Sequence, residues 1–137
     1  MLERLITLTT LIILGVALYH GWKWWGLRRA AHLAHHDPLL ASFVPGQPAI
    51  LYFTADGCVA CKTQQQPAFA RLRSLPGYEA VQIIQVDTDQ QLPDAERWGV
   101  MSLPTTFVLD SQGQPKAVNY GVASAEKLRK QIQEAIA

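Results

Sequence analysis

The longest hydrophobic pattern lies at the N-terminus, where residues 5–19 read LITLTTLIILGVALY without a charge. The uncharged run continues through Trp22, and Lys23 is the first charged residue after it. A helix needs about 20 mostly apolar residues to span a bilayer. That length is reached if Trp22, Trp24 and Trp25 lie at headgroup level while Lys23 extends outward. The pattern predicts a membrane anchor over residues 1–25.

Two other interpretations compete with the anchor. A cleaved signal peptide would need small residues after the apolar run, but the sequence there is the bulky YHGWKWWG. A buried core helix is disfavoured because the run is apolar on every face and the rest of the chain already accounts for a complete domain. Residues 26–36, GLRRAAHLAHH, are expected to form a linker that could continue the helix outward, with solvated histidines at His32, His35 and His36.

From residue 37 the pattern changes to short alternating elements. Asp37 and Pro38 suit the N-cap and first position of a short helix that ends near Phe43. The apolar, β-branched run at 49–55, AILYFTA, predicts a strand buried on both faces. A second buried strand is predicted at 80–88, AVQIIQVDT, followed by a short helix in QLPDAERWGV.

A helix is predicted to begin near Cys58 and to kink at Pro67. TTFVLD is a third predicted strand, joined by a turn centred on Gly113 to PKAVNYG, which pairs back across it. An amphipathic helix closes the chain, with Ser124 as N-cap and one apolar face formed by Leu128, Ile132 and Ile136. Together these elements predict an α/β domain over residues 37–137, with a mixed central sheet flanked by helices.

Length, net charge and cysteine count restrict the classes of function that the chain can have. A chain of 137 residues suits one domain of this kind, and a net charge of +1 gives no field that would attract nucleic acid. The chain has two cysteines, Cys58 and Cys61, which are too few for a stabilising disulfide framework. The cysteine pair is therefore the candidate for chemistry.

A C-x-x-C pair that opens a helix after a buried strand favours redox chemistry. The helix N-terminus should lower the pKa of Cys58 and make it the attacking nucleophile, while Cys61, one turn further on, resolves the mixed disulfide. Zinc would need further ligands, for which only the linker histidines are available. A c-type haem would need a histidine where Lys62 stands. A permanent disulfide closing so small a loop would stabilise little. We expect no metal and no cofactor.

The chain resembles the thioredoxin superfamily across about residues 37–137. The resemblance rests on motifs in matching order: AILYF, DGCVACK, VQIIQVD, WGVMSLPT, FVLDSQGQ and Gly121. It implies a cis peptide bond before Pro104, which lies against the cysteine pair in this family and leaves the backbone of Leu103 free to pair with substrate. The motifs look most like the C-terminal thioredoxin-like domain of bacterial transmembrane thiol:disulfide interchange reductases.

The sequence departs from the family pattern at six positions near the cysteines. Val59 and Ala60 replace the Gly-Pro pair of thioredoxin. Gly57 replaces the tryptophan before the first cysteine, and Tyr52 replaces a buried aspartate. Ile83 replaces the lysine that partners this aspartate, and Gln65 replaces a glutamate. The acid chemistry beneath the cysteines is therefore altered.

These features predict a membrane-anchored thiol-disulfide oxidoreductase that reduces protein disulfides or relays electrons to them, together with a redox partner protein. Counting Arg4 against Lys23, Arg28 and Arg29 places the domain in the cytoplasm. The resemblance places it outside the bacterial inner membrane, in the periplasm, and we follow the resemblance. Two alternatives are a non-catalytic binding module with vestigial cysteines, and metal or copper handling by HLAHH and CVAC.

Overall fold

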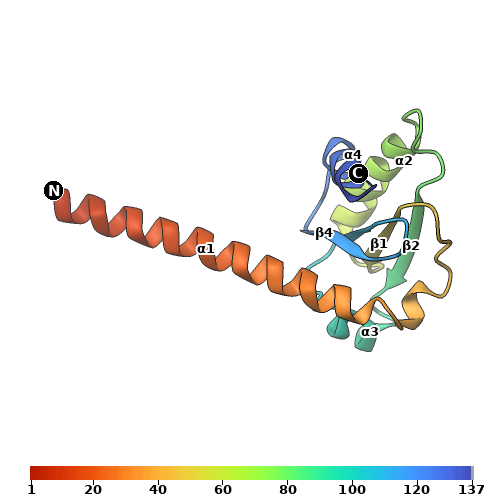
Figure 1. Ribbon diagram of the computed structural model, residues 1–137, viewed down its shortest axis with the longest axis horizontal. Coiled ribbons are helices and arrows are strands. Elements are labelled where there is room, and N and C mark those ends of the chain that lie inside the picture. Colours follow the sequence, from red (N-terminus) through yellow and green to blue (C-terminus); the bar gives the residue numbers. More distant parts are fainter. Residues whose placement is uncertain (137) are drawn as a thin grey trace.

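The computed structural model describes residues 1–136. One long helix, α1 (Leu2–Leu33), extends away from an α/β domain that lies at its C-terminal end (Figure 1). The remaining helical elements are η1 (Pro38–Leu40), η2 (Cys61–Gln65), α2 (Gln66–Arg73), α3 (Leu92–Arg97) and α4 (Ala125–Ile136). The order of elements agrees with the order predicted from the sequence.

The four strands form one mixed sheet, as predicted. They are β1 (Ala49–Thr54), β2 (Gln82–Asp87), β3 (Thr105–Leu109) and β4 (Pro115–Tyr120), in the spatial order β2-β1-β3-β4. Strands β1 and β2 are parallel, whereas β3 is antiparallel to both β1 and β4. Phe53 pairs with Thr105, and Thr105 pairs with Tyr120, so the C-terminal ends of β1 and β4 share one edge with the start of β3.

Strand β2 is a correction to the sequence analysis. We expected a strand buried on both faces, but β2 lies at the edge of the sheet and only Val86 in it is buried. The apolar run resembles a central strand because the apolar side chains of β2 do pack against the domain. Gln82 and Gln85 are polar positions that an edge strand tolerates. Strand β1, by contrast, is buried at every position, as predicted.

The sheet separates two hydrophobic layers. The α2–α4 face packs alternate β1 residues, Ile50 and Tyr52, against side chains that include Leu72 of α2 and Leu128 of α4. The α1–α3 face packs the intervening β1 residues, Leu51 and Phe53, with Trp98 and with parts of α1. The pleat of one buried strand thus supplies both layers.

Helix α1 is longer than the predicted anchor, and its C-terminal part packs against the domain. Residues 26–36, which we expected to be a linker, are helical up to Leu33, and Ala30 is completely buried in the α1–α3 face. The small Ala30 side chain permits this close approach, which polarity alone did not indicate. The three histidines at the end of this segment are exposed, as expected.

The helix that follows Cys58, residues 59–73, is called the active-site helix below. We predicted a kink at Pro67, but the irregular part of this helix lies before Pro67. It begins at Val59, widens into the π-type turn η2, and becomes regular only at Gln66. The Gln66 N–H accordingly bonds to the carbonyl of Cys61, five residues back. Pro67 has no N–H to donate, so the irregular turn falls where the α-helical ladder is already interrupted.

Asp37 caps η1 as predicted and also anchors the α1–α3 face. Its carboxylate accepts the Leu39 N–H at 2.9 Å, the Arg97 Nε at 3.0 Å and the indole Nε1 of Trp98 at 2.8 Å. Burial alone would raise the pKa of Asp37, but the hydrogen bonds from Arg97, Leu39 and Trp98 outweigh it and lower the pKa. The carboxylate is therefore held charged.

Candidate active site

Both cysteines lie where β1 leads into the active-site helix. After Thr54 a short turn brings Cys58 to the position just before the helix, and its sulfur is bonded to that of Cys61. Cys58 is partly exposed, whereas Cys61 is completely buried. The Cys61 N–H donates to the Cys58 sulfur at 3.2 Å. A helix-end donor aimed at this sulfur would stabilise a thiolate on Cys58 in the reduced protein.

The Leu103–Pro104 bond is cis, as the resemblance implied. Pro104 is buried directly before Thr105, and Thr105 pairs with Phe53 near the end of β1. This register places Pro104 at the same edge of the sheet as the turn that leads to Cys58. Leu103 and Cys58 both contact the hydrophobic layer of the α2–α4 face. The structure thus brings together the four residues of the predicted redox and substrate sites.

Gln65 has a role that the sequence analysis missed. Its side chain is completely buried, donates from Nε2 to the Ala123 carbonyl at 3.1 Å and accepts the Ala123 N–H at 2.9 Å. Gly121, two residues earlier, donates its N–H to the Pro104 carbonyl at 2.8 Å. The β4–α4 loop is therefore tied to the helix of Cys61 and to the Pro104 loop. The only signal was that Gln65 matched a glutamate in relatives.

Tyr52 lies in the same hydrophobic layer as Cys61, without a polar partner among the described residues. Its ring packs edge-on against Phe69 with centroids 4.8 Å apart, and within residues 1–136 its buried hydroxyl has no hydrogen-bond partner. Burial raises the pKa of Tyr52. Ile83 is half-buried against the same layer. Among the described residues Asp37 is the single buried charged side chain, and it lies on the opposite face of the sheet.

Gly57 and Lys62, the two supporting residues predicted beside the cysteines, are both exposed. A Cβ added at Gly57 would meet no atom within 4 Å, so the fold itself does not require glycine there. Three exposed apolar side chains are close in sequence to site residues. They are Val59 between the cysteines, Met101 before the Pro104 loop, and Val122 after Gly121.

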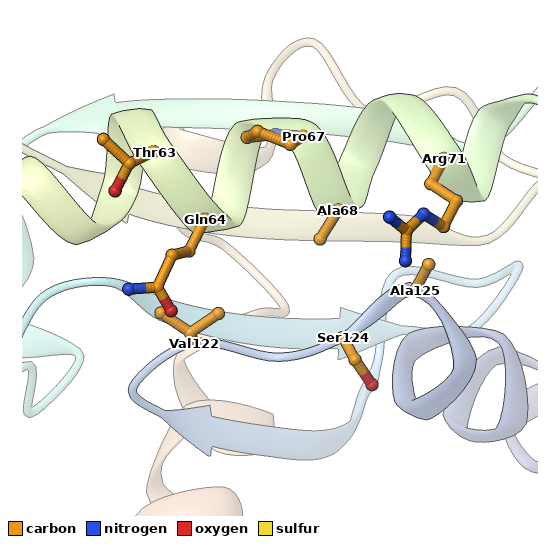
Figure 2. A pocket seen from close by; sticks show the side chains of 8 residues that line it. All are labelled: Thr63, Gln64, Pro67, Ala68, Arg71, Val122, Ser124 and Ala125. Carbon is orange, nitrogen blue, oxygen red and sulfur yellow. The ribbon is translucent and has the colours of Figure 1, made fainter.

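A groove of about 480 Å³ continues from this region along the active-site helix. Figure 2 shows one wall formed by the helix, where Gln64 extends toward Val122 and Arg71 extends toward Ala125. The β4–α4 loop and the start of α4 form the other wall. The β4–α4 loop therefore lines the groove and also bonds to the Gln65 side chain.

The structure does not bring the histidines to the cysteines. His35 lies 3.5 Å from Gln114, at the end of the sheet opposite Pro104. No cluster of three histidine, cysteine or acidic side chains that could hold a metal occurs in residues 1–136. Metal handling gains no support from this part of the chain.

Comparison with known proteins agrees with this geometry. Thioredoxin of Schistosoma mansoni, as a pre-protein in its reduced form, superposes with a TM-score of 0.57 at 26% identity, covering 72% of this chain and 87% of that one. The thiol:disulfide interchange protein TxlA homolog of Synechocystis sp. is 25% identical over 92% of this chain and 71% of its own length. Thioredoxin of Borreliella burgdorferi is 37% identical over 55% of this chain and 62% of its own length.

The fold and the Cys58–Cys61 disulfide define a thioredoxin-like thiol-disulfide oxidoreductase. The family model described as TraF, F plasmid transfer operon protein, matches residues 44–133. The chain belongs to this family.

Proposed function

We propose that the protein is a membrane-anchored oxidoreductase of the bacterial inner membrane that reduces protein disulfides, or relays electrons to them, on the periplasmic side. The observation that carries this proposal is the unequal exposure of the two sulfurs, because Cys58 is accessible and Cys61 is completely buried. An exposed nucleophile with a buried resolving thiol suits exchange with a bulky protein substrate.

The reaction begins with the reduced pair. The Cys58 thiolate attacks one sulfur of the substrate disulfide, and the other substrate sulfur leaves as a thiolate. Cys61 then loses its proton and attacks the Cys58 sulfur of the mixed disulfide. The substrate departs as a dithiol and the Cys58–Cys61 disulfide remains. Two electrons have passed to the substrate, and a dithiol on a redox partner protein restores the reduced pair.

Substrate binding is assigned to Leu103 and Pro104. The apolar side chains of Val59, Met101 and Val122 are exposed near the site, which suits an extended and partly apolar segment around a substrate disulfide. The bond between the Gly121 N–H and the Pro104 carbonyl holds one side of this surface in place.

The membrane anchor is supported by the exposed part of α1. Its most apolar window has a mean hydropathy of 1.7 and none of that window is buried in the protein. The hydroxyls of Thr7 and Thr10 donate back to the carbonyls of Glu3 and Ile6 at 2.8 Å, and Thr9 donates to Leu5 in the same way. These polar groups are therefore satisfied within the helix, as a lipid environment requires.

Two measurements test the proposal. The purified protein should reduce insulin with a thiol donor, whereas Cys58→Ala should not, and an inactive wild type would favour the binding-module alternative. Membranes washed with alkaline carbonate should retain the protein, and protease added to spheroplasts should digest its domain. Digestion only after lysis would place the domain in the cytoplasm, as the Lys and Arg count predicts.

A further inference from the structure

The groove beside the active-site helix continues the surface that we assign to substrate binding. Val122 belongs to both, because it is exposed near the redox site and also lines the groove (Figure 2). Thr63 and Gln64, which line the same end of the groove, follow Cys61 within one helical turn. From there the groove runs along the helix to Arg71 (Figure 2). A polypeptide held at the cysteines can therefore pass directly into the groove.

The two walls of this groove are joined by buried hydrogen bonds. The completely buried Gln65 side chain donates to the Ala123 carbonyl at 3.1 Å and accepts the Ala123 N–H at 2.9 Å. Ala123 lies between Val122 and Ser124, which both line the groove. The helix wall is therefore bonded to the loop wall, so the shape of the groove is built into the fold. A preformed groove reduces the cost of ordering the protein when a ligand binds.

The loop wall also offers backbone hydrogen bonds. Gly121 donates its N–H to the Pro104 carbonyl, and Ala123 uses both of its backbone groups on Gln65. The N–H and carbonyl of Val122 between them have no hydrogen-bond partner within residues 1–136. A free donor and a free acceptor on one residue are the groups with which an extended segment pairs. This arrangement favours a polypeptide as the occupant of the groove.

Arg71 gives the groove its charge. Within residues 1–136 it is the single charged side chain that lines the groove, and its guanidinium has no ion pair and no hydrogen bond. Arg73, by contrast, donates to the Val81 carbonyl at 3.0 Å. Glu126 follows the groove residue Ala125 but does not itself line the groove. The Arg71 guanidinium is therefore available to a carboxylate, which its planar donors can bind at two points.

The distance from the cysteines to Arg71 determines where this carboxylate belongs. A helix rises about 1.5 Å per residue, so the stretch from Val59 to Arg71 covers about 18 Å. An extended polypeptide advances about 3.3 Å per residue. The acidic side chain is therefore expected about five or six residues from the substrate cysteine that reacts with Cys58.

We propose that the groove is a specificity subsite for an extended substrate segment that flanks the reacting cysteine and places an Asp or Glu side chain on Arg71. This inference deepens the proposed oxidoreductase function and rests on it. The chemistry is unchanged, because two electrons pass to the substrate disulfide as the Cys58–Cys61 dithiol becomes a disulfide. Arg71 contacts the substrate away from the reacting sulfurs, so it acts on substrate binding and not on resolution of the mixed disulfide.

The test is a positional scan with disulfide peptides. Each peptide carries one intramolecular disulfide and an uncharged arm, along which a single aspartate is moved one position at a time. One series has the arm before the disulfide, and the other has it after. Reduction by the pre-reduced full-length protein in nonionic detergent is followed by quenched-flow alkylation. In one series the second-order rate constant should peak with aspartate about five or six residues from the cysteine. The peak should lie about fivefold above the matching asparagine peptide.

Variants of Arg71 identify the group that recognises the aspartate. Arg71→Gln should remove the peak, so that aspartate and asparagine peptides react at equal rates. Arg71→Glu should move the preference from aspartate to lysine at the same position, which a purely structural role would not produce. Arg129→Gln is the matched control, because it removes an exposed arginine that does not line the groove, and it should keep the peak. Added salt should lower the peak in the wild type, since the contact is between exposed charges.

The outcomes separate this inference from the proposed function. A scan without a peak in either series would overturn the inference and leave the oxidoreductase intact. A peak that survives in Arg71→Gln, or that is also lost in Arg129→Gln, would remove Arg71 from the explanation and overturn the subsite. Failure of the wild type to reduce any of the peptides, or reduction that persists in Cys58→Ala, would instead overturn the proposed function.

Discussion

The two faces of the central sheet are built on different chemistry. The α1–α3 face contains a buried carboxylate, Asp37, with hydrogen bonds from Arg97 and Trp98. The α2–α4 face contains the disulfide, and its buried polar groups are uncharged. They include the amides of Gln65 and Asn119 and the phenol of Tyr52, which has no hydrogen-bond partner among the described residues. Among residues 1–136, a buried charge is therefore present on the α1–α3 face, where it is paired, and none is buried on the face that contains the disulfide.

This difference separates the source of stability from the source of reactivity. Removing a hydrogen-bonded buried charge leaves its partners unsatisfied, so substitutions at Asp37 should act on unfolding. A carboxylate introduced at Tyr52 should act on the rate of thiol exchange, because that side chain lies in the layer that includes Cys61. The following experiments test this division.

The largest effect is expected from the cysteines themselves. Cys61→Ala should accumulate mixed disulfides through Cys58, since no second thiol can resolve them, whereas Cys58→Ala should accumulate almost none. Non-reducing electrophoresis of partners trapped in cells measures both. The unequal exposure of the sulfurs supports this order of attack. Trapping mainly through Cys61 in Cys58→Ala would reverse the two roles.

Asp37→Asn should lower the free energy of unfolding by about 2 kcal/mol at pH 7, because Asn keeps the cap but loses the charged hydrogen bonds. The folded-state pKa of Asp37 is lowered, so its contribution is present above the unfolded pKa near ~4 and is lost as the pH falls through the folded value. Urea titrations at several pH values measure this.

The difference between wild type and Asp37→Asn should therefore shrink toward zero in strong acid. Glu134→Gln is the control, because the Glu134–Lys130 pair is exposed at 4.0 Å, and it should change stability by less than ~0.5 kcal/mol. A loss in Asp37→Asn that stays constant down to pH 2 would show that the charge of Asp37 is not what stabilises this face.

Tyr52→Asp should speed resolution of the mixed disulfide about tenfold near neutral pH, since it places a carboxylate base in the layer around Cys61. In the wild type, burial raises the pKa of Tyr52, so the phenol is a poor base and resolution should accelerate with pH across the neutral range. Stopped-flow decay of the mixed disulfide against pH measures both proteins. Ile83 offers no cation, so the new carboxylate should also cost stability.

Tyr52→Asn is the matched control for this change, because it has the shape of Asp but cannot act as a base. It should not accelerate resolution. Identical rates and pH profiles for wild type and Tyr52→Asp would mean that another group accepts the Cys61 proton.

The smallest effect is expected for Tyr52→Phe. Removing a buried hydroxyl that has no hydrogen-bond partner should leave stability unchanged or raise it by up to about 1 kcal/mol. Resolution rates should match the wild type if the phenol is not the base. Thermal unfolding and stopped-flow decay check these two expectations. A clear loss of stability would show that the hydroxyl has a partner in solution.

Local patterns made most of this architecture predictable. The buried run of β1, the Asp37 cap and the Gly113 turn each depend on neighbouring residues, and the cis bond at Pro104 came from a short motif. Sheet order is not local, so β2 was predicted as a buried strand although it lies at an edge.

Contacts between distant segments were not predictable in the same way. The Gln65 contact with Ala123 joins residues 58 positions apart in the sequence, and the Trp22 stack joins α1 to the end of β4. The sequence predicts Trp22 at headgroup level, because a tryptophan that follows an apolar run is typical of a membrane interface. The same local sequence is compatible with the stack on Tyr120. Nothing in the pattern around Gly26 indicates that Tyr120 lies against it.

The packing of α1 against β4, where Trp22 stacks on Tyr120, also determines how much of the chain a water-soluble fragment must keep. Strand β4 is an edge strand whose Val118 and Tyr120 side chains contact the layer that includes Ala30. A fragment that starts at residue 37 would uncover these side chains beside an unpaired strand edge, an arrangement that promotes self-association. A fragment that starts near residue 20 would lose the apolar segment and keep its cover. The first 36 residues therefore form two parts: an exposed apolar segment that we propose spans the membrane, and a packed segment that completes the hydrophobic layer of the catalytic domain.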